Sequence, residues 1–189
     1  MALLDTPRLH LRPLDAGDEA VYCRLYCDPG LMRHIAPPLA PDAARRSFAV
    51  ACRLQRPRAQ RWIALARAGA APVGLVALVD RGESCAEPGV MLLAAWHGQG
   101  LATEAMAAVR DHGFGTLRLA RMRALQQDPA NLAVLRLMPR LGFRRAIAHP
   151  PPGVLWEMER GEWAGPGPRA GGDAADGGKL RASGSGNQG

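Results

Sequence analysis

The alternation of strand-like and helix-like periodicity along the first 163 residues is the strongest constraint on the fold. Residues 8–14 alternate apolar and polar side chains, which is typical of a half-buried strand, and residues 15–28 place apolar side chains on one stripe of a helix. The remaining pattern predicts strands at 61–66, 73–79, 90–93, 121–126 and 154–160, and helices at about 43–55, 100–114 and 131–140. Because strand hairpins are mixed with helical crossovers, this order predicts an α+β domain around one mixed sheet.

The chain length and the composition of its end predict one domain with a tail. A chain of 189 residues is long enough for one substantial core and short for two. Residues 164–189 are rich in Gly, and Leu180 is their one large aliphatic side chain, so this segment cannot offset the entropy of ordering itself. We therefore expect a domain at 1–163 and a disordered tail at 164–189. The chain has neither a membrane-spanning apolar run nor a secretion signal, which favours a cytoplasmic protein without membrane contact.

Charge and cysteine usage exclude some other classes of site. The four cysteines have no Cys or His partners at zinc spacing, so buried reduced thiols and no metal are expected. The net charge of +7 comes from scattered arginines with a single lysine, and neither an aromatic ladder nor a helix-turn-helix pattern accompanies them. The charge therefore favours a solvated surface over nucleic-acid binding. Part of it suits a cofactor that carries phosphate.

Gly98 and Gly100 stand immediately before the helix predicted at 100–114. The first N–H groups of a helix have no partner within it, and the helix dipole adds to their attraction for anions. Glycine permits positive φ and close approach of a phosphate, and Ala102 keeps the next turn small. The pattern lacks the third glycine of a dinucleotide fingerprint and the Gly-Lys-Ser/Thr of a P-loop. It indicates a phosphate-binding turn of another kind, with a plain tight turn as the alternative.

Five short segments, in order, have features of one known family. They are an opening strand at 6–14, a Glu-x-Gly-x-x-Leu strand at 87–92, a glycine loop at 96–105, Asn131 followed by Leu-Gly-Phe-Arg at 141–144, and a closing strand at 155–163. Together they resemble the GNAT superfamily of N-acetyltransferases, especially the branch with the ribosomal-protein-alanine N-acetyltransferases. The resemblance covers residues 3–163. It implies a mixed, mostly antiparallel central sheet flanked by helices on both faces.

The resemblance also implies a reaction and a set of cofactor residues. Acetyl-CoA would be the cosubstrate, and a primary amine would attack its thioester directly. The backbones of Val90, Met91 and Leu92 would pair with the pantetheine arm and place an N–H near the thioester carbonyl, where one oxyanion donor contributes about 3 kcal/mol. Asn131 would hydrogen-bond the cofactor, with an ordinary helix N-cap as the alternative. The diphosphate would lie against Gly98, Gln99, Gly100, Leu101, Ala102 and Thr103.

The chain departs from the family pattern at residues that handle protons. Val134 and Met138 stand where relatives often carry Ser and Tyr, and neither side chain can act as an acid. Gln126 stands where some relatives carry a proton-accepting Glu. His97 replaces the usual Gln or Arg of the loop, with little loss expected because the loop acts through its backbone. Pro139 removes a backbone bond from its helix, so a short or kinked helix is expected.

Glu87 is the best remaining base, because it begins the strand expected beside the thioester. Asp80 and Glu83 are weaker candidates, and a solvated loop carboxylate is the alternative for each. Near pH 7.4, deprotonating an amine of pKa near 10.4 costs about 4 kcal/mol, whereas an α-amine of pKa near 7.8 costs about 0.5 kcal/mol. A site with so few acid–base groups suits a low-pKa primary amine, such as a peptide N-terminus or a small amino metabolite.

Two other function classes stay open from the sequence. One is a degenerate module that binds acyl-CoA without turnover, and the other is a basic nucleic-acid-binding protein. The sequence does not identify the acceptor, and it is compatible with a monomer or a homodimer.

Overall fold

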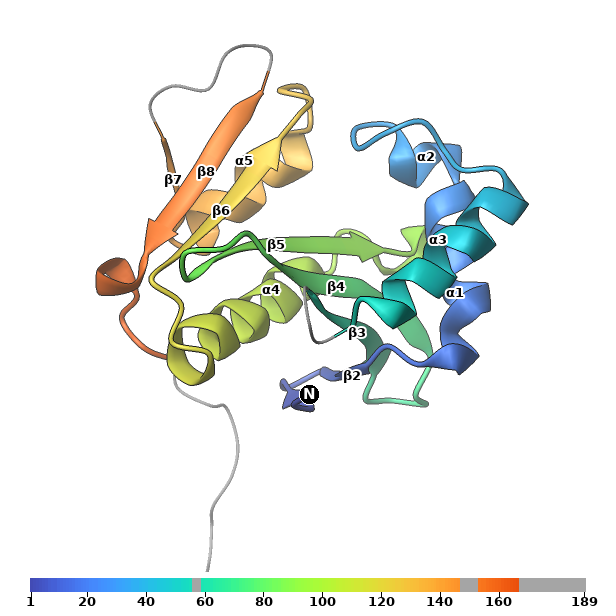
Figure 1. Ribbon diagram of the computed structural model, residues 1–189, viewed down its shortest axis with the longest axis horizontal. Coiled ribbons are helices and arrows are strands. Elements are labelled where there is room, and N and C mark those ends of the chain that lie inside the picture. The colour runs from blue at the N-terminus through green and yellow to red at the C-terminus, as the bar shows by residue number, and fades with distance from the viewer. Residues whose placement is uncertain (56–58, 147–152, 167–189) are drawn as a thin grey trace, which may run out of the picture.

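A computed structural model describes residues 1–55, 59–146 and 153–166. Its centre is an eight-stranded sheet in the order β1-β2-β3-β4-β5-β6-β8-β7 (Figure 1). The strands are β1 (Leu4–Asp5), β2 (Leu9–Pro13), β3 (Ala59–Ala66), β4 (Pro72–Asp80), β5 (Cys85–Leu92), β6 (Arg121–Gln126), β7 (Arg144–Arg145) and β8 (Val154–Glu159). Neighbouring strands pair antiparallel except β5 and β6, which pair in parallel. The predicted mixed, mostly antiparallel sheet is confirmed.

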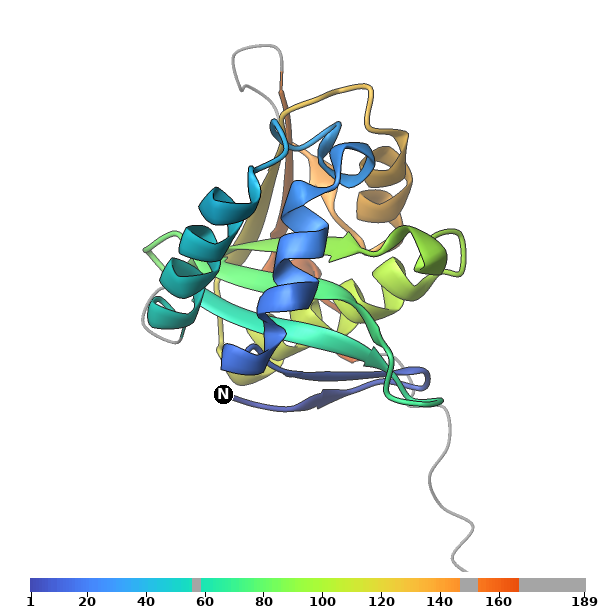
Figure 2. The same cartoon turned by 90° about the vertical axis from the view of Figure 1, so that its right-hand side faces the viewer.

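Helices cover both faces of this sheet (Figures 1 and 2). The helices are α1 (Glu19–Cys27), α2 (Pro29–Met32), α3 (Pro41–Arg53), α4 (Leu101–Asp111) and α5 (Leu132–Arg140). One face carries α1 and α3, with α2 beside α1, and the other face carries α4 and α5. The helices on the two faces bury their apolar side chains in two separate hydrophobic clusters.

Each face of the sheet has its own hydrophobic cluster. Beneath α4 the cluster includes Phe114 and Met122, which are fully buried. Beneath α1 and α3 it includes Leu25, Phe48 and Ile63. Burial of one such side chain contributes roughly 2 kcal/mol, so the two clusters together hold the helices on the sheet.

The predicted elements are present, and most of their bounds agree within a few residues. The predicted 90–93 strand is wrong in its start, because β5 begins at Cys85. Residues 88 and 89 are Pro and Gly, which usually interrupt a strand and concealed its first half. The short elements β1, β7 and α2 were not predicted, because segments of two to four residues show no periodicity. The cysteines are free, but their predicted burial is wrong for three of the four: Cys85 is buried, whereas Cys23, Cys27 and Cys52 are partly exposed.

The predicted tail at 164–189 lies mainly outside the described residues, so the boundary at 163 stays a prediction. The chain contacts the rest of the domain as far as Trp163, whose indole N–H donates to Asp111 on α4 at 2.8 Å. Within the described residues, no helix combines the length and the apolar character needed to cross a lipid bilayer.

Candidate active site

Strands β5 and β6 separate after a short stretch of pairing. β5 pairs with β4 along its length, from Ala86 opposite Asp80 to Leu92 opposite Gly74. With β6 it pairs only at Cys85 and Ala86. In the part of the chain that the structure describes, no strand therefore lies against the other edge of β5 between residues 87 and 92. Backbone polar groups need partners, so this open edge can receive the amides of a ligand.

The glycine turn ends beside this open edge. Gly98 and Gly100 have φ angles of 74° and 76°, in the left-handed region that glycine adopts without strain. Gly100 is the N-cap of α4, and no side chain caps that end of the helix. The N–H groups at the start of an 11-residue helix and the helix dipole both attract anions, and phosphate binding at this end of α4 stays a prediction. The predicted backbone geometry at both glycines is confirmed.

The glycine turn is anchored by side chains from the N-terminal segment. The Arg8 guanidinium donates to the backbone oxygen of Gln99 at 2.9 Å and to the carboxylate of Glu104 at 2.7 Å. The Thr6 hydroxyl donates to Glu104 at 2.6 Å. Burial opposes the ionisation of Glu104, but these hydrogen bonds outweigh it and lower the pKa of its carboxyl. Sequence reasoning gave neither Arg8 nor Glu104 a role, although an acidic residue in the first turn of α4 was a signal.

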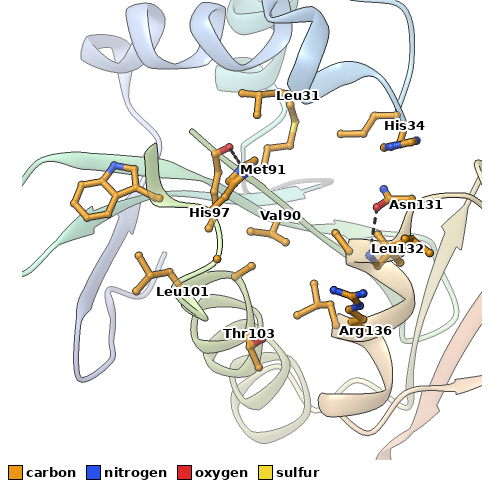
Figure 3. Close-up of a pocket in the computed structure, with 18 of the residues that line it drawn as sticks. Leu31, His34, Val90, Met91, His97, Leu101, Thr103, Asn131, Leu132 and Arg136 are labelled. Carbon is orange, nitrogen blue, oxygen red and sulfur yellow. Dashed lines mark hydrogen bonds between the residues drawn. The ribbon is translucent and has the colours of Figure 1, made fainter. Parts of the chain in front are cut away.

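A cavity of about 730 Å³ opens between β5, α4, α5 and the loop that follows α2 (Figure 3). Four separate segments reach it: the end of β5, the glycine turn, the start of α5, and residues 30–35. Every residue predicted to bind the cofactor lines this cavity except Gln99, whose side-chain amide donates to the backbone oxygen of Ala95 at 3.1 Å. The lining members of that set are Val90, Met91, Leu92, Gly98, Gly100, Leu101, Ala102, Thr103 and Asn131.

Asn131 is the N-cap of α5. Its side-chain oxygen accepts a hydrogen bond from the backbone N–H of Val134 at 3.3 Å, so the capping role is confirmed. Capping uses the amide oxygen and leaves the NH₂ group to donate elsewhere, so capping and cofactor binding are compatible. The cofactor role stays a prediction.

The residues that depart from the family pattern have structural roles. Gln126 is buried, and its side-chain amide donates to the backbone oxygens of Asp128 and Asn131 at 2.9 and 3.3 Å and accepts from Trp156 at 2.9 Å. Met138 lies in the core and does not line the cavity. Gln126 thus fixes the loop between β6 and α5 and Met138 packs the domain, so neither is placed to transfer a proton.

Glu87 lies away from the cavity. It forms an ion pair with Arg81, which donates to it from Nε at 2.8 Å and also from Nη2. It lines a separate surface hollow with Arg81 and Arg123. The structure therefore does not bring Glu87 together with the cofactor residues, and its role as a base stays a prediction.

His97 lines the cavity from the loop before α4. Its Nε2 donates to the backbone oxygen of Leu92 at 2.8 Å, which ties the glycine turn to the end of β5. A histidine in this place therefore has a structural function.

The charged side chains that line the cavity are basic. They are Arg33 from the loop after α2, and Arg136 and Arg140 from α5. Among the described residues that line the cavity there is no Asp or Glu. Guanidinium groups suit phosphate, so the electrostatics of the cavity favour an anionic ligand.

Comparison with known proteins identifies what this arrangement resembles. Residues 8–144 match a family model described as an acetyltransferase (GNAT) domain. An uncharacterized N-acetyltransferase p20 of Bacillus licheniformis is 28% identical over 150 residues, which are 77% of this chain and 84% of that protein.

Solved structures share the fold. A ribosomal-protein-S5-alanine acetyltransferase from Vibrio fischeri has a TM-score of 0.72 at 14% identity, covering 86% of this chain and 99% of that one. A spermidine N-acetyltransferase from Vibrio cholerae, in complex with CoA and spermine, has a TM-score of 0.71 at 17% identity, covering 82% and 96% of the two chains.

Proposed function

Because the chain belongs to the GNAT family of acetyltransferases, we propose that it transfers an acetyl group from acetyl-CoA to a low-pKa primary amine. Such an amine is a peptide α-amine or a small amino metabolite. The observation that carries the proposal is the convergence of the predicted cofactor residues, from separate segments, on one cavity.

The residues around this cavity fit the parts of acetyl-CoA. The uncapped N–H groups at the start of α4 suit the diphosphate, and Arg136 and Arg140 suit phosphate charge. The open edge of β5 offers backbone groups to the amides of the pantetheine arm. The cofactor therefore would lie along β5, with its diphosphate at the glycine turn.

The same strand would stabilise the transition state. When the amine attacks the thioester carbon, negative charge develops on the carbonyl oxygen. A backbone N–H of residues 90–92 directed at that oxygen would contribute about 3 kcal/mol, because the donor is already oriented. The amide product and the CoA thiol then leave from the open cavity.

The lining of the cavity supports a particular class of acceptor. A polyamine carries several positive charges, and the three arginines that line the cavity would repel them. Among the described lining residues there is no carboxylate to offset this repulsion. Deprotonating an α-amine near pH 7.4 costs only about 0.5 kcal/mol, so it needs less help from acid–base groups than a lysine side chain. A peptide N-terminus, or a metabolite whose amine accompanies a carboxylate, fits better than spermidine.

The test is a CoA-release assay with acetyl-CoA and matched acceptors, beside calorimetry with CoA. The acceptors are a peptide with a free N-terminus, the same peptide with its N-terminus blocked and one internal lysine, and spermidine. We expect heat from CoA binding and turnover that favours the free N-terminus. Preference for lysine or spermidine would contradict the acceptor class, and CoA binding without turnover on any amine would indicate an acyl-CoA-binding module.

A further inference from the structure

A histidine–aspartate pair joins two loops at the rim of the cavity. His34 follows α2, and Asp128 follows β6 and precedes α5, so the pair links segments 94 residues apart. The His34 Nδ1 and the Asp128 Oδ2 are 2.5 Å apart. His34 lines the cavity, and Figure 3 shows it near Asn131, across Val90 from His97.

The hydrogen bonds of His34 determine which ring nitrogen carries a proton. A carboxylate only accepts, so Nδ1 must donate its N–H to Asp128. The Nε of Arg33 donates to the other nitrogen, Nε2, at 3.1 Å, so Nε2 must hold a lone pair. In this arrangement Nε2 is the ring atom that can accept a proton. Arg33 is exposed, so an incoming amine can displace it.

Asp128 is itself firmly oriented. Its Oδ1 accepts from the backbone N–H of Ala130 at 2.8 Å, and its backbone oxygen accepts from the buried Gln126. The hydrogen bond from His34, with that from Ala130, lowers the pKa of the Asp128 carboxyl, which keeps it ionised. Gln126 stands where some relatives carry a Glu base. Its side chain instead holds the backbone of Asp128, the carboxylate that contacts His34.

The cavity offers few other bases. Among its described lining residues there is no Asp, Glu, Tyr or Cys. The second histidine, His97, donates a hydrogen bond from Nε2 to the backbone oxygen of Leu92. A carboxylate orients an imidazole and stabilises its protonated form, which a backbone carbonyl does less well. His34 is therefore the better base.

We propose that His34 is the general base of the acetyl transfer, with Asp128 as the residue that positions it. This inference rests on the proposed function. Nε2 of His34 takes one proton from the ammonium of the acceptor, and the freed amine attacks the thioester carbon. The C–N bond forms, the C–S bond breaks, and the second amine proton goes to the departing thiolate. His34 then returns its proton to solvent.

Asp128 faces His34 from the β6–α5 loop, Arg33 from its own loop, and His97, Arg136 and Arg140 lie farther around the same cavity. Asp128 is the carboxylate among these groups, and it orients the ring for proton transfer.

The deciding variant is His34→Asn, whose amide can keep the bond to Asp128 but has no basic nitrogen. His10→Asn is the matched control, because His10 on β2 forms a similar pair with Asp5 on β1 and does not line the cavity. We expect kcat/KM of His34→Asn to fall by about 100-fold or more. Its CoA affinity and melting temperature should stay near those of the wild type, and His10→Asn should match the wild type in all three.

The pH profile separates a base from a structural link. The wild-type kcat/KM should rise with pH and level off as the imidazole deprotonates, whereas His34→Asn should keep rising with the ionisation of the amine itself. Asp128→Asn should lower kcat/KM and leave CoA affinity near that of the wild type, because Asp128 orients the base and does not line the cavity. The proposal would be overturned if His34→Asn kept the kcat/KM and the pH profile of the wild type. It would also be overturned if the variant lost activity together with CoA binding while its pH profile stayed unaltered. Absence of CoA binding in the wild type would instead overturn the proposed function.

Discussion

At the residue scale, Gly98 and Gly100 set the geometry of the turn that precedes α4. A Cβ added at Gly98 would meet no atom within 4 Å, and one at Gly100 would lie 3.6 Å from the Arg8 guanidinium. Space is therefore available at both positions. The glycines are required by their positive φ, which costs other residues roughly 1–2 kcal/mol.

Gly100→Ala is therefore expected to weaken CoA binding. Alanine would favour a turn with negative φ, and the N–H groups at the start of α4 would then point away from the diphosphate. We expect about a tenfold loss of CoA affinity, with a loss of stability of about 1 kcal/mol. Calorimetry and urea unfolding measure the two effects.

Gly161→Ala is the control for this change, because Gly161 lies far along the chain, has no positive φ, and has open space at its Cβ. It should leave both quantities unchanged. Wild-type CoA affinity in Gly100→Ala would show that the turn does not hold the diphosphate.

At the scale of elements, Glu104 ties the N-terminal segment to the first turn of α4. Its carboxylate accepts from Thr6 and Arg8, and the same Arg8 holds the backbone of Gln99 in the glycine turn. The position of the turn relative to β5 therefore depends on a network that crosses nearly 100 residues of sequence.

This network predicts a pH dependence of stability. The pKa of Glu104 lies below its ordinary value of 4.5 in the folded state, so the folded state favours the ionised form. The resulting stabilisation is complete above the ordinary pKa, and it is lost as the pH falls through the lower folded pKa. Glu104→Gln should therefore be about 1–2 kcal/mol less stable than the wild type at neutral pH, and the gap should close in acid.

Unfolding curves between about pH 7 and pH 3 measure this difference in the free energy of unfolding between the wild type and Glu104→Gln. Glu19→Gln is the control, because Glu19 is an exposed carboxylate whose ion pair with Arg45 is 3.7 Å long. It should show little gap at any pH. A Glu104→Gln gap of the same size at pH 3 as at pH 7 would contradict ionisation as its origin.

At the scale of the whole molecule, the excess of basic residues is distributed in two ways. Many arginines pair with carboxylates at the surface, for example Arg45 with Asp42 at 2.7 Å and Arg144 with Glu162 at 2.9 Å. Others, including Arg136 and Arg140, line the cavity. The arginines at the cavity suit the phosphates of the proposed cofactor, so this part of the positive charge has a candidate ligand other than nucleic acid.

The domain boundary leads to a prediction for the whole chain. Trp163 donates to Asp111 and packs against Phe114 with ring centroids 6.0 Å apart, so the last element of the domain is held by α4 and the turn that follows it. A chain that ends at residue 166 should melt within about 2 °C of the full chain and bind CoA equally well, because the composition of the removed segment cannot support a core.

A chain that ends at residue 161 is the matched comparison, since it loses Trp163. It should melt several degrees lower, as expected for a loss of roughly 2 kcal/mol in a domain of this size. If the chain ending at 166 were equally destabilised, the segment after 166 would belong to the domain.

The sequence by itself determined the features that depend on neighbouring residues. Periodicity predicted the principal strands and helices, and two glycines before an amphipathic helix predicted a turn with positive φ, because backbone conformation is a local property. The family motifs predicted the sheet and a set of cofactor residues, all of which except Gln99 line the cavity.

Only the tertiary structure decided which distant groups meet. Sequence reasoning chose Glu87 as a base from its place at the start of a strand, but the fold pairs it with Arg81 away from the cavity. The separation of β5 from β6, and the meeting of His34 with Asp128, had no local signal. Contacts across long sequence separations arise from the packing of the helices on the whole sheet, which no short segment encodes.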